Sequence, residues 1–392
     1  MSASKPSRAD ASQTIPDVDL VIVGAGFAGL YMLHRARRLG MSALVFEAGS
    51  GVGGTWYWNR YPGARCDVES MQYSYSFSPE LQQEWNWSEL FASQPEILAY
   101  ANHVADRLDL RRDIRLDTRV TQARFDETTL RWEIRTDHGE RVSARHCVMA
   151  TGCLSTARMP DFEGLSSYRG EIYHTGHWPH EGVDFTGRRV AVIGTGSSAI
   201  QAIPVIAEQA AHVTVFQRTP NFSIPSRNGP MTPEYERWWK SAYPEHRAKA
   251  RQMRAGVVYD INEKSALEVT EEERMREYEA RWAAGGTAFM AAFADLAINQ
   301  RANDTAAEFV RAKIRETVKD PDTAELLAPK IIRSAPSASA SIRVTTRLTI
   351  ARTSPWSMSK ASQSLSSPRT ACARAGPSTR SMPSSSPPAS MR

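Results

Sequence analysis

The sequence predicts an α/β fold with two Rossmann-like domains, the second of which carries a helical insertion. Three observations support this prediction. Apolar runs at residues 20–23 and 190–193 are typical of buried parallel strands. A glycine-rich loop follows each run at once, and each loop leads into a segment with apolar residues at helical spacing. A further short apolar strand, at 43–46 and at 213–216, completes each βαβ unit.

The first loop, residues 24–29, has glycine at three positions that suit the binding of a pyrophosphate. Gly24 permits a tight turn, Gly26 lets the backbone approach the anion, and Gly29 lets the helix pack closely on the strand. The N-terminus of that helix also attracts negative charge. Glu47 lies ~20 residues further on, where a carboxylate can accept hydrogen bonds from the ribose hydroxyls. This unit is therefore predicted to bind a dinucleotide.

The second loop, residues 194–199, repeats the pattern with alanine at the third glycine position. Where the first unit has Glu47, this unit has Gln217 followed by Arg218 and Thr219. A carboxylate there would repel a 2′-phosphate, whereas a guanidinium can bind one through paired, charge-assisted hydrogen bonds. NADP is therefore expected rather than NAD, although an ordinary solvated arginine at a strand end is the alternative. The predicted contacts are Gly194, Thr195, Gly196, Ser197, Ser198, Gln201, Arg218 and Thr219.

The composition argues against several other classes of protein. The chain has 392 residues and a formal net charge of +5, but residues 331–392 contain nine Lys or Arg and no Asp or Glu. The rest of the chain is mildly acidic, so no nucleic-acid partner is expected. The four cysteines show neither a disulfide framework nor zinc-ligand spacing, and no metal site is predicted. Without an apolar run of the ~18 residues that span a bilayer, a cytoplasmic location away from membranes is expected.

A peptide between the two loops narrows the prediction to one family. Residues 168–179 contain, in order, Tyr168, Gly170, His174, Trp178 and Pro179. This peptide resembles the fingerprint of Baeyer–Villiger monooxygenases, which usually has Phe where Tyr168 stands. Residues 53–73 resemble the flavin-site stretch of the same family. The resemblance adds to the FAD contacts of the first loop and Glu47 the residues Gly54, Thr55, Trp56, Arg65, Asp67, Tyr73 and, against the adenine, Val120.

The resemblance also implies the domain boundaries. Residues 1–18 are expected to be a disordered N-terminal extension. An FAD-binding domain is expected at 19–160 and an NADP-binding domain at 161–330, with the helical insertion at about 231–328. Residues 331–392 are expected to be a disordered, basic tail that is not native to the family.

The insertion shows several signals for the ends of helices. Pro233 is expected to begin one helix, and Thr270 with Glu273 forms a capping box for another. Two glycines at 285–286 are expected to end that second helix. Residues 303–305 (Asn-Asp-Thr) are expected to cap the last one.

The resemblance implies a particular reaction. In an intact member, NADPH passes a hydride to FAD, and the reduced flavin takes up O₂ to form a C4a-peroxyflavin that converts a ketone into an ester or lactone. Asp67 is the expected catalytic residue, because it positions an arginine that keeps the peroxide unprotonated. The fingerprint histidine, His174, is expected to couple the two domains rather than to transfer protons.

Three alternatives stay open to different degrees. A related flavin monooxygenase that oxygenates nitrogen or sulfur shares the two-loop plan, although the peptide at 168–179 argues against it. A disulfide reductase needs a close cysteine pair beside the flavin, and Cys66 has no such neighbour in the sequence. The chain is also compatible with an inactive, truncated protein that binds FAD. The oligomeric state and the identity of the ketone stay open.

The composition changes abruptly at Ile331, and a shift of the reading frame explains the change. With the frame moved one base upstream, residues 378–392 can be translated as EYEVDAIVFATGFDA and residues 331–347 as DHPFGTKRIRIDTGYYE. Both translations resemble segments that follow the helical insertion in Baeyer–Villiger monooxygenases. A frameshift after Lys330 is therefore our interpretation, and the coding DNA tests it directly. It implies an impaired enzyme, because the family's Lys-Arg pair at the NADPH phosphate and the flavin is missing.

Overall fold

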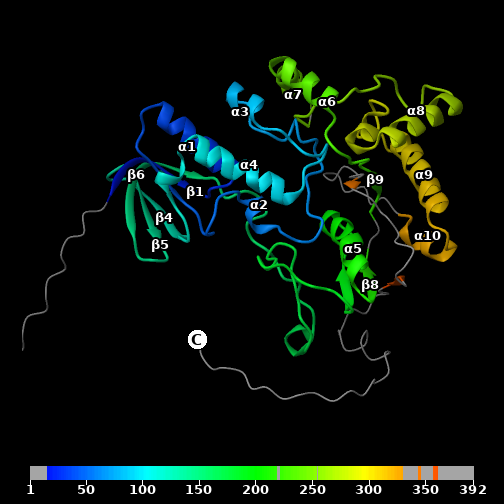
Figure 1. Ribbon diagram of the computed structural model, residues 1–392, viewed down its shortest axis with the longest axis horizontal. Coiled ribbons are helices and arrows are strands. Elements are labelled where there is room, and N and C mark those ends of the chain that lie inside the picture. Colours follow the sequence, from blue (N-terminus) through cyan, green and yellow to red (C-terminus); the bar gives the residue numbers. More distant parts are fainter. Residues whose placement is uncertain (1–15, 219–220, 254, 330–342, 346–355, 361–392) are drawn as a thin grey trace, which may run out of the picture. The chain divides into compact units, whose positions relative to one another are not determined.

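The computed structural model describes residues 16–218, 221–253 and 255–329, and the backbone of two short strands at 343–345 and 356–360. Figure 1 shows how these elements are arranged.

The chain divides into two compact units. The first unit comprises residues 1–157 and 173–360 and contains both predicted nucleotide-binding domains. The second comprises residues 158–172 and 361–392, and its described part contains one short 3₁₀ turn, Leu165–Ser167.

The order of the elements contains two βαβ units and, after the second of them, a run of helices. The helices are α1 (Phe27–Arg38), α2 (Thr55–Trp58), α3 (Pro79–Glu84), α4 (Gln94–Arg107), α5 (Ser197–Gln209), α6 (Pro233–Ser241), α7 (Tyr243–Gln252), α8 (Glu271–Ala284), α9 (Gln300–Thr317) and α10 (Pro321–Leu327). The strands are β1 (Asp17–Val23), β2 (Ala43–Phe46), β3 (Ile114–Arg115), β4 (Val120–Asp126), β5 (Arg131–Thr136), β6 (Arg141–Met149), β7 (Arg189–Ile193), β8 (His212–Gln217), β9 (Ser223–Pro225), β10 (Arg343–Thr345) and β11 (Trp356–Lys360).

The first domain is built on a six-stranded sheet in the order β3-β2-β1-β6-β5-β4. Strands β3, β2, β1 and β6 are parallel, whereas β6, β5 and β4 form an antiparallel meander. Strand β1 lies between β2 and β6, and its Leu20, Val21 and Ile22 are at most 1% exposed. Helices α1 and α4 contribute to one apolar cluster with this strand and run next to each other in Figure 1. The predicted α/β fold of this domain is confirmed.

The second domain repeats the unit with β7, α5 and β8, but its central strand is less enclosed. Strands β7 and β8 are parallel, with Val190 opposite Val213. Among the residues that the structure describes, β7 pairs with β8 alone, and Ile193 is 63% exposed. The corresponding strand of the first domain has neighbours on both sides. Strand β7 of the second domain therefore has a neighbouring strand on one side, whereas β1 of the first domain has one on each side.

Residues 331–392 contain two short strands, and the expectation of a disordered tail stays a prediction. Strand β10 pairs with β9 and strand β11 pairs with β8, both in parallel, although this region was predicted to lack regular structure. The rest of the predicted tail lies outside the described residues. Pairing of this kind is explained by main-chain groups, because an edge strand offers N–H and C=O groups to any extended segment whatever its side chains are.

The helices of the expected insertion run from α6 to α10, and one predicted helix cap needs correction. At α8, Thr270 and Glu273 form both hydrogen bonds of the capping box, and the helix ends at the glycine pair. The prediction that residues 303–305 cap the last long helix is wrong. Asn299 caps α9 instead by accepting from two backbone N–H groups, so 303–305 lie inside the helix. The Asn303 amide is used elsewhere, since it donates to the carbonyl of Leu296 at 3.0 Å.

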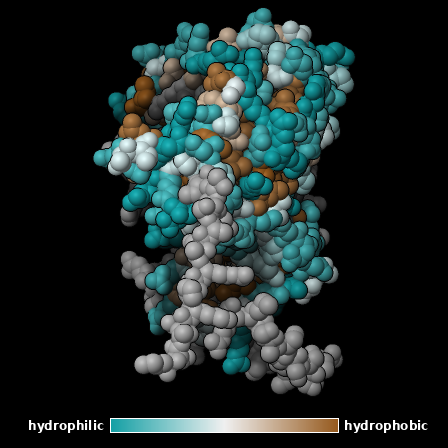
Figure 2. Space-filling model, turned by 90° about the vertical axis from the view of Figure 1, so that its left-hand side faces the viewer, coloured by the Kyte–Doolittle hydropathy of each residue, from teal (hydrophilic) through white to brown (hydrophobic). Residues whose placement is uncertain are grey.

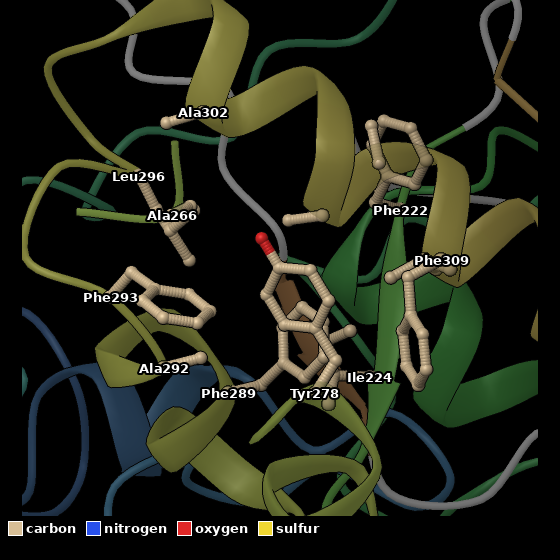
Figure 3. Packing of buried hydrophobic residues seen from close by; sticks show 13 residues of the cluster. Phe222, Ile224, Ala266, Tyr278, Phe289, Ala292, Phe293, Leu296, Ala302 and Phe309 are labelled. Carbon is tan, nitrogen blue, oxygen red and sulfur yellow. The ribbon is translucent and has the colours of Figure 1, made fainter. Parts of the chain in front are cut away.

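Aromatic side chains fill the core of the insertion (Figure 3). Tyr278 on α8 packs against Phe289 and Phe309 with ring centroids 5.6 and 5.4 Å away. Its hydroxyl forms a hydrogen bond of 2.7 Å with Thr305 on α9, so the one polar atom of this ring is satisfied. Ile224 on β9 contributes to the same cluster, which ties the insertion to the strand that precedes it.

On the face seen in Figure 2, hydrophilic and hydrophobic residues are interspersed. Every helix among the described residues is too short or too polar to cross a membrane.

Substitution of Phe289 by alanine tests whether this aromatic core stabilises the insertion. Phe289 is fully buried, and removal of a buried phenylalanine side chain typically costs about 3–5 kcal/mol. We expect a clear shift of the urea unfolding transition toward lower concentration, measured by circular dichroism. Ile298→Ala is the matched control, because Ile298 is 78% exposed. An equal shift in both variants would contradict this account of the core.

Candidate functional site

The first glycine loop connects β1 to α1 at a point where three pieces of backbone meet. Gly24 has a φ of +106°, and a Cβ there would lie 2.6 Å from the carbonyl oxygen of Ala150, just after β6. A Cβ on Gly29 would overlap the carbonyl oxygen of Gly24. Among the described residues no side chain caps the N-terminus of α1, so N–H groups of its first turn stay available to an anion.

Glu47 holds this loop from the end of β2. Its side chain is 6% exposed, and its two carboxylate oxygens accept hydrogen bonds from Ala25 N at 2.7 Å and Gly49 N at 2.8 Å. Each oxygen has two lone pairs, so both keep capacity for a further donor such as a ribose hydroxyl. The structure therefore gives Glu47 a second task, which the sequence did not predict.

A second backbone segment approaches the same loop. Gly54 has a φ of +56°, and a Cβ on Gly26 would lie 3.3 Å from the Cα of Gly54. Next to it, Trp56 is buried and donates from its indole nitrogen to the hydroxyl of Tyr73 at 3.0 Å, while Thr55 begins α2 and is exposed. The structure thus brings the predicted residues at 54–56 to the glycine loop.

The loop between Tyr61 and Asp67 packs directly on helix α5 of the second domain. Gly63 has a φ of +74°, and a Cβ there would overlap the carbonyl oxygen of Gln201. Burial raises the pKa of Tyr61, while a hydrogen bond with the side chain of Ser198 acts in the opposite direction. Two residues of α5 that were predicted to bind NADP, Ser198 and Gln201, therefore contact the loop that carries Asp67.

Gln201 makes four hydrogen bonds to that loop. Its Oε1 accepts from the Tyr61 hydroxyl at 2.9 Å and from Arg65 N at 3.3 Å. Its Nε2 donates to the carbonyl of Arg65 at 3.1 Å and to Oδ1 of Asp67 at 3.1 Å. The side chain is 5% exposed. Its predicted contact with a cofactor stays a prediction, and its contacts in this structure are with the first domain.

The guanidinium group of Arg65 is directed toward the first domain. Its Nη1 lies 2.7 Å from Glu89 Oε2 and 3.1 Å from the carbonyl oxygen of Phe91. A cofactor contact by this side chain stays a prediction. Val120 stands at the start of β4, opposite Thr136, and is half-buried in an apolar cluster.

The second glycine loop has the same backbone course with more space around it. Gly194 has a φ of +107°, close to that of Gly24, but a Cβ on Gly194 or Gly196 would meet nothing within 4 Å among the described residues. Helix α5 follows, and its N-cap residue is Gly196, which has no side chain to cap the helix. Its first-turn N–H groups are therefore suited to a phosphate as well.

The end of β8 differs from the end of β2 as predicted. Gln217 donates from Nε2 to the carbonyl of Leu326 at 2.7 Å, and the next residue, Arg218, is exposed. Thr219 lies outside the described residues. Asn221 donates to the carbonyl of Thr195 at 3.0 Å and so anchors the second loop.

The part of the fingerprint peptide from Tyr173 onward packs into the second domain. Trp178 is 7% exposed and lies with Tyr173 and Phe185 in the cluster that covers α5. His174 Nδ1 accepts from Gly176 N at 3.0 Å, so this histidine closes a turn. The described contact is structural, and the expected role of His174 in coupling the two domains stays a prediction.

His177 of the peptide and His180 just after it also lie close to aromatic rings of the first domain. The ring centroids of Tyr57 and His180 lie 5.0 Å apart in an edge-to-face arrangement, and those of Trp58 and His177 lie 6.3 Å apart. Helix α2 is therefore a second place where the two nucleotide-binding domains touch.

The described cysteines do not form the close pair that a disulfide reductase needs beside its flavin. Cys66, Cys147 and Cys153 form no disulfide with one another. Burial raises the pKa of the Cys66 thiol to about 12, which leaves it protonated and poorly nucleophilic. Among the described residues there is also no group of three or more His, Cys, Asp or Glu that could hold a metal ion.

Three residues of this site were not singled out by the sequence interpretation: Tyr61, Gly63 and Asn221. The Pro-Gly pair at 62–63 predicts a turn but not the helix on which it packs. Asn221 follows a strand like many loop residues, so its contact with Thr195 depends on the fold.

Two domains that pair an anion-binding helix N-terminus with a strand-end acid or base define a flavoprotein-type dinucleotide oxidoreductase. A family model described as pyridine nucleotide-disulphide oxidoreductase matches residues 21–317. The chain belongs to this family.

Its relatives include Baeyer–Villiger monooxygenases, which confirms the resemblance predicted from the sequence. The 2-oxo-Delta(3)-4,5,5-trimethylcyclopentenylacetyl-CoA monooxygenase of Pseudomonas putida is 44% identical over 80% of this chain and 59% of that protein. A Baeyer–Villiger monooxygenase of Pseudooceanicola batsensis is 43% identical over 80% of this chain and 58% of that protein. A phenazine N-monooxygenase of Lysobacter antibioticus is 42% identical over 79% of this chain and 58% of that protein.

Solved structures agree with these relatives. A steroid monooxygenase with bound NADP is 60% identical, with a TM-score of 0.77 over 80% of this chain and 60% of that one. A cyclohexanone monooxygenase from Rhodococcus has a TM-score of 0.79 and 39% identity over 85% of this chain and 65% of that one. The chain thus spans about 60% of the length of the relatives that it matches.

The variant Gly29→Ala tests the close packing of the first loop. Its methyl group would overlap the Gly24 carbonyl, and overpacking of this kind typically costs about 1–3 kcal/mol. Because the displaced loop is the predicted anion site, we expect FAD to bind ~10- to 100-fold more weakly in a fluorescence titration. Gly229→Ala is the control, since a Cβ there meets nothing within 4 Å among the described residues. Unchanged FAD affinity in Gly29→Ala would contradict the assigned site.

Proposed function

We propose that this chain is the nucleotide-binding part of an FAD- and NADPH-dependent monooxygenase that converts ketones to esters or lactones with O₂. The observation that carries the proposal is that α1 and α5 each begin at a glycine after the same glycine turn, with an acid at the first strand end and a cation at the second. One protein that holds two dinucleotides passes electrons from one to the other.

The first site fits FAD. The backbone of Gly54 approaches that of Gly26 closely, and neither glycine has a side chain that would keep a pyrophosphate away from the N–H groups of α1. Glu47 keeps acceptor capacity for the ribose. Bound flavin supplies hydride acceptance and the activation of O₂. The chain's own residues bind it and orient it.

The second site fits NADPH. Arg218 follows the strand end directly and is exposed, so its guanidinium is accessible to a 2′-phosphate. Gln217 is neutral and turned toward Leu326, so it does not repel that phosphate. Ser197 and Ser198 begin α5, where the pyrophosphate is expected.

Asp67 is the residue of this chain that we assign to the chemistry. Its Oδ1 accepts from Gln201, which fixes the carboxylate on the side of the loop that faces α5. A carboxylate held in this way can orient a cationic side chain beside the flavin. The cationic side chain that the family uses here belongs to the Lys-Arg pair that this sequence lacks. Loss of one preorganised hydrogen-bond donor typically lowers the rate by ~10²–10³, so we propose reduced turnover for this chain.

Two other functions share the site. The similarity to a phenazine N-monooxygenase favours nitrogen oxygenation as a second candidate activity. A protein that binds FAD without turnover is the third. For each of the three we propose a cytoplasmic location and small-molecule partners, with no nucleic acid or membrane.

Product analysis separates these functions. The purified chain is supplied with FAD, NADPH and O₂, together with a cyclic ketone, a thioether or a tertiary amine. We expect NADPH oxidation linked to lactone formation from the ketone. Oxygenated amine or thioether without lactone would favour the second activity, and bound flavin without any product would favour the third.

The variant Arg218→Ala tests the choice of nicotinamide cofactor. Hydrogen bonds to charged groups contribute about 1.5–3 kcal/mol, so we expect NADPH to bind ~10- to 100-fold more weakly while NADH affinity stays the same. Calorimetric titration measures both affinities. Arg189→Ala is the control, because Arg189 begins β7 and is exposed at the opposite end of the strand from the loop. A parallel loss for NADH and NADPH would argue against a phosphate contact.

A further inference from the structure

Helix α5 contributes to both candidate nucleotide sites. Its N-terminus, at Ser197, faces the expected phosphate of the second nucleotide. One turn further on, the helix holds the loop of the first domain that carries Asp67. The two sites are therefore joined by a single rigid element rather than by a flexible linker.

The contact between helix and loop has little freedom. Gly63 lies against the backbone of α5 so closely that a methyl group does not fit. Gln201 satisfies both main-chain groups of Arg65 as well as Asp67, and it is 5% exposed. A shift of the loop along the helix would leave buried polar groups without partners, which is unfavourable.

Ser198 extends this contact to the first turn of the helix. Its side chain hydrogen-bonds with Tyr61, whose hydroxyl donates in turn to Gln201. A chain of hydrogen bonds thus leads from the first turn of α5 to the carboxylate of Asp67. It runs from Ser198 to Tyr61, from Tyr61 to Gln201 and from Gln201 to Asp67.

We propose that Gln201 is a positioning residue that couples the two sites, so that each nucleotide strengthens the binding of the other. The inference rests on the proposed function. Coupling of this kind is reciprocal, since the factor by which NADP⁺ raises FAD affinity must equal the factor by which FAD raises NADP⁺ affinity. Coupling factors between sites are typically ~5 to 150. Gln201 acts through Asp67 and the loop.

Titrations with the oxidised nucleotides test the coupling without turnover. FAD is titrated into the full-length chain with and without saturating NADP⁺, and NADP⁺ is titrated with and without FAD. For the unchanged chain we expect both ratios of Kd to be equal and at least about fivefold. For Gln201→Ala we expect the ratio to fall to about one, whatever the affinity of the variant for each nucleotide alone.

The matched control is Gln209→Ala. Gln209 lies on the same helix and accepts from Phe185 N within the second domain, and it is exposed. We expect this variant to keep the coupling of the unchanged chain. Thermal unfolding followed by circular dichroism shows whether each variant is folded.

A double variant that exchanges donor and acceptor between positions 201 and 67 tests whether the coupling can be restored. Gln201→Glu keeps an acceptor for Tyr61 but sets two carboxylates against each other at Asp67, so the coupling should be lost. Adding Asp67→Asn restores one hydrogen bond with donor and acceptor exchanged, and part of the coupling should return. The visible circular dichroism of bound FAD, recorded as NADP⁺ is added, follows the same order.

The outcomes separate this inference from the proposed function. Independent binding of both nucleotides by the unchanged chain, or undiminished coupling in a folded Gln201→Ala variant, overturns the inference and leaves the proposed function standing. Failure of the unchanged chain to bind either nucleotide overturns both.

Discussion

The structure depends on how closely backbone can approach backbone where a side chain is absent. At the first site three glycines allow β1, α1 and the segments after β6 and before α2 to meet, as the spaces around Gly24, Gly26 and Gly29 show. The same close approach leaves main-chain N–H groups of α1 facing outward at the end of the sheet. Both the packing of the domain and its ability to hold an anion therefore follow from one constraint. The contact of Gly63 with α5 extends this constraint from one domain to the next.

The two βαβ units are alike in backbone course and different in enclosure. Gly24 and Gly194 have φ angles of +106° and +107°, so the turn is the same. In the first unit β6 returns beside β1 and brings Ala150 against the turn, while β7 lacks such a neighbour among the described residues. The second unit gains order from other contacts instead: its α5 packs against the fingerprint peptide through Trp178 and against the flavin-site loop through Gln201. The fingerprint peptide and the flavin-site loop thus pack against the second domain as well as contributing to the candidate site.

Local patterns predicted the elements of the fold, because strands such as 43–46 and the capping box at Thr270 are specified by neighbouring residues. The wrong cap at 303–305 shows the limit of this reasoning: several Asn and Asp residues can cap, and burial of the Asn303 side chain decides against it. The contacts of Gln201 span more than 130 residues of sequence, so no local pattern could reveal them. For the same reason Arg65 could be placed in the flavin-site stretch, but not the direction of its guanidinium toward Glu89.

The exchange of an acid for a cation at the strand end requires more than one substitution. Glu47 does two things in the first unit: its carboxylate holds the glycine loop through Ala25 N, and it keeps acceptor capacity for a ligand. Gln217 turns instead toward α10, so the second loop needs another anchor. Asn221 supplies it by donating to Thr195 from beyond the strand end. Because the loop no longer depends on a strand-end acid, the strand end is available for a positive charge, and the same backbone can select a phosphorylated ribose.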